Sequence, residues 1–121
     1  MKELTRAEEE IMQILWQLDH AKVSEIIDQM QHKKPSYNTV STIVRILQDK
    51  GFVSFRKEGR GYRYFPIVNK EAYQASRMNT YVNNYFDGSF KNMLSFFVKK
   101  KEVNVDDLEA ILNQINPKDD A

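Results

Sequence analysis

Residues 36 to 66 constrain the fold of this chain most, because they specify a helix followed at once by a tight hairpin. In the first half, apolar side chains recur at spacings of three and four, which predicts a helix with one buried stripe. The stripe consists of Val40, Ile43, Val44 and Leu47. Ser36 can cap the first turn, and Gly51 stands where helices often end in a left-handed residue. We therefore expect a helix over residues 36 to 50.

The second half of this stretch has the pattern of a β-hairpin. Residues 52 to 57 and 62 to 66 alternate between apolar and polar side chains, which is the period of a β-strand. The four residues between them, Glu58-Gly59-Arg60-Gly61, tolerate the backbone angles of a turn. We expect a two-stranded wing directly after the helix.

Positive charge is concentrated in the same stretch. Residues 32 to 63 contain eight lysines or arginines and two acids, a local charge of +6 within a chain of net charge +1. Affinity for DNA of any sequence comes from neutralising phosphates, so this segregated charge favours a DNA-binding surface. The exposed helix face carries Asn38, Ser41, Thr42 and Arg45, and the hairpin tip carries Arg56, Lys57, Arg60 and Arg63. A polar face alone is more typical of an ordinary surface helix, and it is the adjoining basic hairpin that favours recognition.

Two helices are expected before this stretch. The first covers residues 5 to 19, where Thr5 and Glu8 have the spacing of a capping box. Its buried face is formed by Ile11, Leu15 and Leu18, with Met12 and Trp16 beside them. The acids at positions 8 to 10 are interpreted as exposed groups of the first turn, where they suit the helix dipole.

A second, shorter helix is expected over residues 23 to 31, and the segment from His32 to Pro35 joins it to the third. Three helices followed by a hairpin are the arrangement of a winged helix-turn-helix. The fold class expected is mainly α with a small β-hairpin wing.

Three more amphipathic helices are expected over the rest of the chain: residues 70 to 86, a helix capped by Ser89, and a last one capped by Asn104 and Asp107. They are too short to bury a core alone, so we expect them to pack on a second copy of the chain. The candidate dimer contacts are Tyr81, Tyr85, Phe86, Phe90, Met93 and Phe97. Packing back on the amino-terminal part, or lining a ligand pocket, are alternatives. The expected domains are a winged-helix domain over 1–68 and a helical dimerisation domain over 69–121.

Other classes of function have little support in the sequence. The chain has no cysteine, no apolar run that could span a membrane and no apolar segment typical of a signal peptide, so we expect a cytoplasmic protein without membrane insertion. His20 and His32 have no acidic or sulfur neighbours at ligand spacing, and no nucleophile and base are paired. We expect no metal, no cofactor and no enzyme activity.

Several short motifs, in order along nearly the whole chain, resemble the penicillinase repressor family (BlaI/MecI/CopY). They are Leu4-Thr5-x-Ala7-Glu8, Met12, Leu15-Trp16, Thr39-Val40-x-Thr42, Lys50-Gly51-Phe52, Lys57-Glu58-Gly59-Arg60, Tyr64-x-Pro66, Val68 and Phe86-x-Gly88-Ser89. The resemblance implies a homodimeric bacterial repressor whose winged helices bind a palindromic double-stranded DNA operator. By matching positions it also implies DNA contacts from the third helix and from a wing arginine. The candidate DNA contacts are Ser36, Asn38, Thr39, Ser41, Thr42, Arg45, Lys57 and Arg60.

This chain departs from the family pattern at four places. Many relatives have a tryptophan where it has Glu9, and an arginine where it has Ile46, with Arg45 one position earlier. The cysteine-rich motif of the copper-responsive branch is absent, so release by metal is not expected. The Asn-Phe bond cut in the lactam-responsive branch corresponds to Phe96-Phe97, so no inactivating protease or signal carries over from the resemblance.

The function expected is that of a dimeric winged-helix repressor that blocks a promoter by occupying it. One alternative is a winged-helix module that binds a protein and leaves the hairpin charges solvated. A small nucleic-acid enzyme is a weaker alternative, because no metal cluster or nucleophile is visible.

Overall fold

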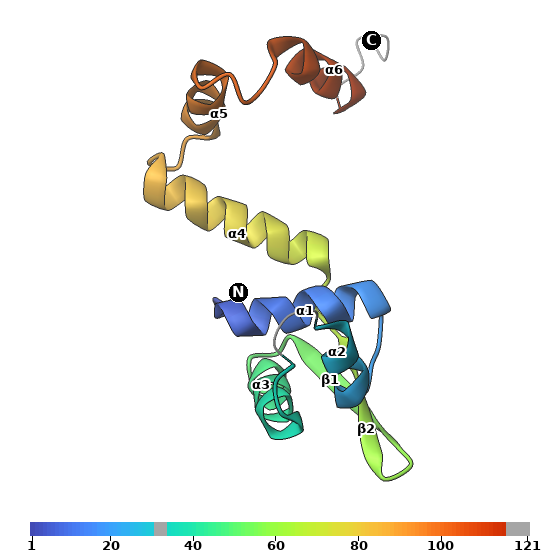
Figure 1. Ribbon diagram of the computed structural model, residues 1–121. Helices are drawn as coiled ribbons and strands as arrows, with labels where there is room; N and C mark the ends of the chain where they lie inside the picture. Colours follow the sequence, from blue (N-terminus) through green and yellow to red (C-terminus); the bar gives the residue numbers. More distant parts are fainter. Residues whose placement is uncertain (31–33, 116–121) are drawn as a thin grey trace. The chain divides into compact units, whose positions relative to one another are not determined.

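The computed structural model describes residues 1–30 and 34–115, and it has the expected fold class, mainly helical with one antiparallel hairpin (Figure 1). The expected joint at residues 32 and 33 lies outside the described residues. The elements are α1 (Arg6–Leu18), α2 (Val23–Gln29), α3 (Tyr37–Asp49), β1 (Val53–Glu58), β2 (Gly61–Pro66), α4 (Lys70–Tyr85), α5 (Phe90–Lys99) and α6 (Val105–Ile115). Contacts divide the chain into two units, Met1–Ser76 and Arg77–Ala121.

Helix α1 begins with the expected capping box. The Thr5 amide donates to the Glu8 carboxylate at 3.1 Å, and the Glu8 amide donates to the Thr5 hydroxyl at 3.2 Å. These two bonds satisfy amide groups that the helix itself leaves without partners. The expected apolar face is confirmed, and it includes one more buried side chain, Ile14.

Glu8 is buried, so the expectation of an exposed acid in the first turn is wrong for this residue. Only 5% of its surface is exposed, and its carboxylate lies 2.6 Å from the ammonium group of Lys50, at the end of α3. Lys50 also donates to the carbonyl of Glu3. Glu8 is buried because a cation distant in sequence accompanies it, whereas Glu10 is exposed as expected.

Helix α3 confirms the expected start, stop and buried stripe. The Thr39 amide donates to the Ser36 hydroxyl at 3.1 Å, which caps the first turn. Val40, Val44 and Leu47 are fully buried. Gly51 has a φ of +83°, a conformation that glycine adopts without the strain of a Cβ atom.

The wing follows at once, but its turn is tighter than expected. The strands pair in register from Val53↔Pro66 to Glu58↔Gly61, so only Gly59 and Arg60 remain in the loop. Glu58 and Gly61 are therefore strand residues rather than turn residues. Gly59 has a φ of +60°, which suits the first position of a two-residue hairpin loop.

A short bridge ties the wing to the segment between α1 and α2. The Ala21 amide donates to the Tyr64 carbonyl at 2.9 Å, and the Tyr64 amide donates to the Ala21 carbonyl at 2.8 Å. This single pair acts as a minimal third strand beside β2. A one-residue bridge has no alternating pattern, so the sequence carried no signal for it.

The core of the first unit extends into the start of α4. Trp16 is partly buried, and its indole N–H donates to the Val68 carbonyl at 2.8 Å. Tyr73, which is 4% exposed, packs against the rings of Trp16 and Phe52 and donates its hydroxyl to Glu9 at 2.9 Å. Core contacts thus continue past the boundary expected at residue 68. The division into a winged-helix domain over 1–68 and a helical dimerisation domain over 69–121 remains a prediction.

The second unit contains the rest of α4 with α5 and α6. Ser89 caps α5 by accepting from the Asn92 amide at 3.1 Å, as expected. The Asn104 side chain accepts from the Asp106 amide at the start of α6, whereas Asp107 lies inside that helix and is not a cap. Among the described residues, no helix has the length and apolar character needed to cross a membrane.

Candidate nucleic-acid interface

The outward face of α3 brings most of the candidate base contacts together. Asn38, Thr39, Thr42 and Arg45 are exposed, and Ser41 is half-buried. Asn38, Thr42 and Arg45 lie opposite the buried stripe because the helix repeats every 3.6 residues, and Thr39 and Ser41 lie on its two flanks. The face therefore presents amide, hydroxyl and guanidinium groups, which are the chemistry that reads base edges in a major groove.

Some of these hydroxyl groups already take part in the helix. The Ser36 hydroxyl caps α3 and lies 2.8 Å from the hydroxyl of Thr39. The hydroxyl of Thr42 donates to the Asn38 carbonyl at 2.8 Å. Such bonds fix the rotamers of these side chains and leave acceptor lone pairs on their oxygens.

The wing has two different faces, because side chains alternate along each strand. Phe55, Lys57, Tyr62 and Tyr64 share one face, as the pairs Phe55↔Tyr64 and Lys57↔Tyr62 require. The opposite face carries the pair Arg56↔Arg63. The basic residues counted at the hairpin tip are thus separated onto two sides.

The first of these wing faces and α3 enclose a groove with a volume of about 350 Å³. Its lining residues are Arg45, Gln48, Asp49, Phe55, Tyr62 and Tyr64. Phe55 and Tyr62 meet edge to face at 5.1 Å between ring centroids, and 42% and 46% of their surfaces are exposed. The sequence does not predict this aromatic pair, because the alternation of side chains does not indicate which face of a hairpin meets the preceding helix.

Tyr64 is the buried residue among those that line this groove. Burial raises the pKa of its hydroxyl above the ordinary value of 10.0, although the nearby charge of Arg45 lowers it. The phenol is therefore neutral at physiological pH and can donate a hydrogen bond.

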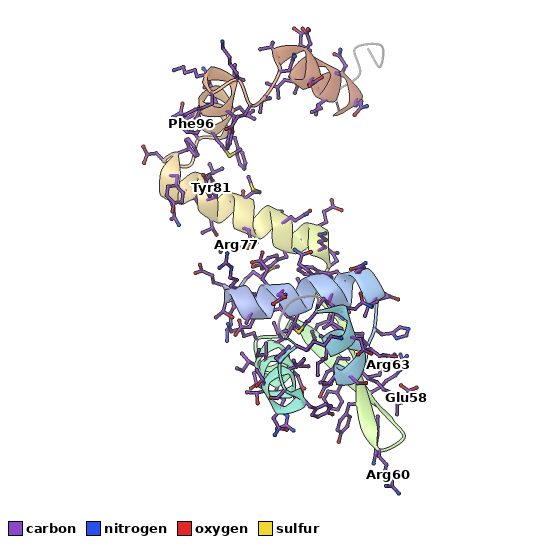
Figure 2. All side chains as sticks on the ribbon, in the orientation of Figure 1. Glu58, Arg60, Arg63, Arg77, Tyr81 and Phe96 are labelled. Carbon is purple, nitrogen blue, oxygen red and sulfur yellow. The ribbon has the colours of Figure 1, made fainter. Side chains whose placement is uncertain are left out.

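Arg60 and Arg63 have different surroundings, although both were counted in the same basic cluster. Arg60 projects from the end of the hairpin (Figure 2). Arg63 forms ion pairs with Glu58 and with Glu25, and 14% of its side chain is exposed. Its charge is compensated within the protein, so the solvent-facing cations of the wing are Arg56, Lys57 and Arg60.

The candidate dimer contacts lie in the second unit with unequal exposure. Tyr81, Tyr85 and Phe90 are exposed, Phe86 and Phe97 are half-buried, and Met93 is buried. Several of their rings are close, with centroids 4.7 Å apart for Tyr81 and Tyr85. The ring centroid of Phe96, which is labelled with Tyr81 in Figure 2, lies 5.7 Å from that of Phe86.

Groups suited to metal chemistry do not gather in the described ranges. No cluster of three or more histidine, aspartate, glutamate or cysteine side chains is found there. His20 instead lies beside Arg63, with its Nδ1 atom 3.0 Å from the guanidinium.

Known proteins with similar sequences include bacterial regulatory proteins and repressors. The family model of the penicillinase repressors matches residues 4–117. The methicillin resistance regulatory protein MecI of Staphylococcus aureus (strain N315) is 28% identical over 117 residues, which cover 96% of this chain and 95% of that protein. The penicillinase repressor of Staphylococcus aureus is 27% identical over 120 residues, with the same coverage.

A solved structure agrees with the fold of the first unit. The solution structure of the DNA-binding domain of the repressor BlaI matches with a TM-score of 0.52 at 28% identity, and the match covers 60% of this chain and 94% of that domain. The chain belongs to the penicillinase repressor family, and it is a DNA-binding transcriptional repressor rather than an enzyme.

Proposed function

We propose that this repressor is a homodimer that occupies a palindromic operator. Each subunit places α3 in a major groove and the wing against the adjacent DNA backbone. The observation that carries the dimer is the apolar surface of the second unit. Among the described residues of that unit, the buried hydrophobic side chains are Val82 and Met93.

Many other apolar side chains of the same unit are exposed. They are Met78, Tyr81, Tyr85, Phe90, Leu94, Phe96, Val105, Ile111 and Leu112. Monomeric proteins rarely expose so much apolar surface in one region, which marks an interaction site. A second copy is the partner that fits best, because a two-fold dimer covers the same surface on both subunits and pairs two recognition helices.

The DNA contacts are of two kinds. Asn38, Thr39, Ser41 and Thr42 on α3 read base edges, since hydrogen bonds to bases carry sequence information. Lys57 and Arg60 on the wing neutralise phosphates. Arg45 is placed between these two groups, on one wall of the groove that also holds Phe55 and Tyr62.

We further propose that this groove receives the sugar-phosphate strand that separates the major groove from the wing. Arg45 supplies a positive charge for a phosphate, and the exposed aromatic pair supplies an apolar surface for a deoxyribose. Repression then follows from occupancy, because a dimer bound across the promoter excludes RNA polymerase. Two-fold symmetry requires half-sites about one helical turn apart, or a multiple of it.

The experiment compares the full chain with a fragment that ends at Ser76. This end point retains Val68 and Tyr73, which complete the core of the winged helix. The operator is first obtained by selection from random duplexes, and binding is then measured on the full operator and on a half-site. We expect the full chain to sediment as a dimer at micromolar concentration and to bind the full operator at least a hundredfold more tightly than the fragment does.

Two results would contradict the dimer. One is a full chain that sediments as a monomer while it is bound to the operator. The other is a fragment that binds the full operator as tightly as the full chain. Equal binding of both proteins to the half-site is the control, because it shows that the fragment is folded and active.

Two substitutions separate the two kinds of DNA contact. Asn38→Ala should weaken operator binding by about 1–3 kcal/mol and change binding to random DNA little, because it removes a base contact. Arg60→Ala should weaken binding to both duplexes and reduce the salt slope by about one unit, because it removes a phosphate contact. Equal losses for Asn38→Ala on both duplexes would place Asn38 among the phosphate contacts instead.

A further inference from the structure

Arg63 joins three segments of the winged helix through one side chain. Its Nε atom donates to Glu58, the last residue of β1, and its Nη1 atom donates to Glu25 of α2 at 3.0 Å. The same Nη1 atom lies 3.0 Å from Nδ1 of His20, in the segment between α1 and α2. In Figure 2, Arg63 and Glu58 lie beside each other on the wing.

The partners of Arg63 are themselves held in place. Glu25 also accepts from the Lys22 amide at 2.8 Å and so closes the first turn of α2. This backbone hydrogen bond and the charge of Arg63 hold the pKa of the Glu25 carboxyl below its ordinary value. A hydrogen bond from Arg63 lowers the pKa of Glu58 in the same way, and that bond raises the pKa of Arg63. All three groups are charged at physiological pH.

The ion pairs of Arg63 lie in the outer half of the wing, between Tyr64 and the tip. The main-chain bridge between Ala21 and Tyr64 holds β2 at Tyr64, near the middle of the strand. Between Tyr64 and the tip, no other strand of the described residues lies beside the hairpin, and an isolated two-stranded hairpin is only marginally stable in water. Arg63 is the next residue toward the tip, and Glu58 directly precedes the loop that carries Arg60.

We propose that Arg63 is a positioning residue for DNA binding. It anchors the outer wing to α2 through Glu25 and braces β1 through Glu58, so that Arg60 is held where it meets the DNA backbone. The inference rests on the proposed phosphate contact of Arg60. Arg63 itself contributes little direct attraction to DNA, because two carboxylates compensate its charge.

A double-mutant cycle on random duplex DNA tests the inference. Arg60→Ala should lower the affinity of the full chain about tenfold, the size of a lost charged hydrogen bond. In the Arg63→Gln variant, the same Arg60 substitution should lower the affinity for DNA less than twofold, because the tip of the wing is no longer held against the DNA backbone. The change in salt slope caused by Arg60→Ala should shrink in parallel.

Two matched variants separate positioning from loss of charge. Arg56→Gln removes the same charge from the cross-strand partner of Arg63, and its effect should add to that of Arg60→Ala rather than reduce it. Arg63→Lys keeps the charge, but a single ammonium group cannot replace the planar guanidinium that donates to both carboxylates. This variant should therefore behave like Arg63→Gln.

For Glu25→Gln, long-range electrostatics and the positioning role of Arg63 predict opposite changes in the affinity for DNA. The glutamine side chain still accepts from the Lys22 amide, so the capping of α2 is retained. Removing a negative charge should strengthen binding to DNA if only long-range electrostatics matter. If Arg63 positions the wing through Glu25, the variant should instead bind random DNA several times more weakly.

The outcomes distinguish the proposed phosphate contact of Arg60 from the proposed positioning role of Arg63. If Arg60→Ala has no effect in the parent protein, the proposed wing contact is wrong. If Arg60→Ala weakens binding equally in the parent and in Arg63→Gln, the wing contact holds and the positioning role of Arg63 is overturned. Stronger binding by Glu25→Gln would also overturn it. Far-ultraviolet circular dichroism and urea unfolding of each variant confirm that folded proteins are compared.

Discussion

Glu8 connects α1, the first helix of the winged helix, to the end of α3 through its ion pair with Lys50. Burial opposes ionisation of its carboxyl group, but hydrogen bonds from Lys50 and Thr5 and the charge of Lys50 outweigh burial and hold its pKa below the ordinary value of 4.5. A carboxyl group whose pKa is lower in the folded state stabilises the fold above its unfolded pKa. That contribution is lost as the pH falls through the folded pKa.

Glu8→Gln should therefore reduce stability in a pH-dependent way. At pH 7 we expect the free energy of unfolding to fall by about 1–3 kcal/mol, because a charged hydrogen bond to Lys50 is lost while glutamine can still complete the capping box. The difference from the parent protein should narrow below about pH 4.5, where Glu8 of the unfolded chain begins to bind a proton. Urea unfolding between pH 3 and pH 8, at one fixed protein concentration, measures this difference.

The exposed Glu10 provides the control for this substitution. Glu10→Gln should change the free energy of unfolding by less than about 0.5 kcal/mol, as for most surface positions. The role assigned to the ion pair with Lys50 would be contradicted if the difference in free energy of unfolding between the parent protein and Glu8→Gln were independent of pH.

At the scale of single elements, α3 and the wing are joined so closely that they form one surface. Gly51 ends the helix, Phe52 is buried, and β1 begins at Val53. No flexible linker separates the two elements. The groove between α3 and the wing is therefore formed by the fold of the winged helix itself. The aromatic pair on the wing side of this groove can be tested by substitution.

Substitution of Tyr62 separates a ring contact from a hydroxyl contact in this groove. Tyr62→Ala should weaken binding to operator and random DNA alike, by about 1 kcal/mol, because the proposed deoxyribose contact loses apolar area. Tyr62→Phe should retain most of the affinity if the ring makes the contact. Fluorescence anisotropy with labelled duplexes measures both. Parent-like affinity of Tyr62→Ala would show that the groove does not receive the DNA strand.

At the scale of the whole molecule, the proposed dimerisation predicts that stability depends on protein concentration. Unfolding of a dimer releases two chains, so the midpoint of thermal unfolding should rise as the concentration rises. The second unit should show this dependence most clearly, since its own buried apolar residues are few.

Tyr85→Lys tests this surface at its most exposed aromatic residue, of which 71% is accessible. In a dimer interface an aromatic anchor contributes about 2 kcal/mol, so the dissociation constant of the dimer should rise roughly thirtyfold. Sedimentation equilibrium measures the change. Ile67→Lys, an equally drastic change at an exposed position of the first unit, should leave the dissociation constant as it is. A similar shift for both variants would argue against an interface at Tyr85.

The sequence by itself determined the elements of this protein, because their signals are local. The capping groups Thr5, Ser36 and Ser89 lie within one turn of the amide groups they satisfy. The spacing of Val40, Val44 and Leu47 specifies one helix face without reference to any other element. Order and spacing of such elements were sufficient for the winged-helix fold, whereas the resemblance to the penicillinase repressor family, which the family model confirms, depended on short motifs of particular residues.

The tertiary structure alone decided which side chains meet across the fold. Glu8 is buried because Lys50 reaches it from 42 positions away, and Arg63 is compensated by Glu25 from 38 positions away. The sequence shows these residues only as charges, and their partners depend on how α1, α2, α3 and the wing pack. The same packing selects which face of the hairpin meets α3, since period-two alternation defines two faces but not their neighbours. Ion pairs and the groove are long-range contacts, and only the folded chain brings their members together.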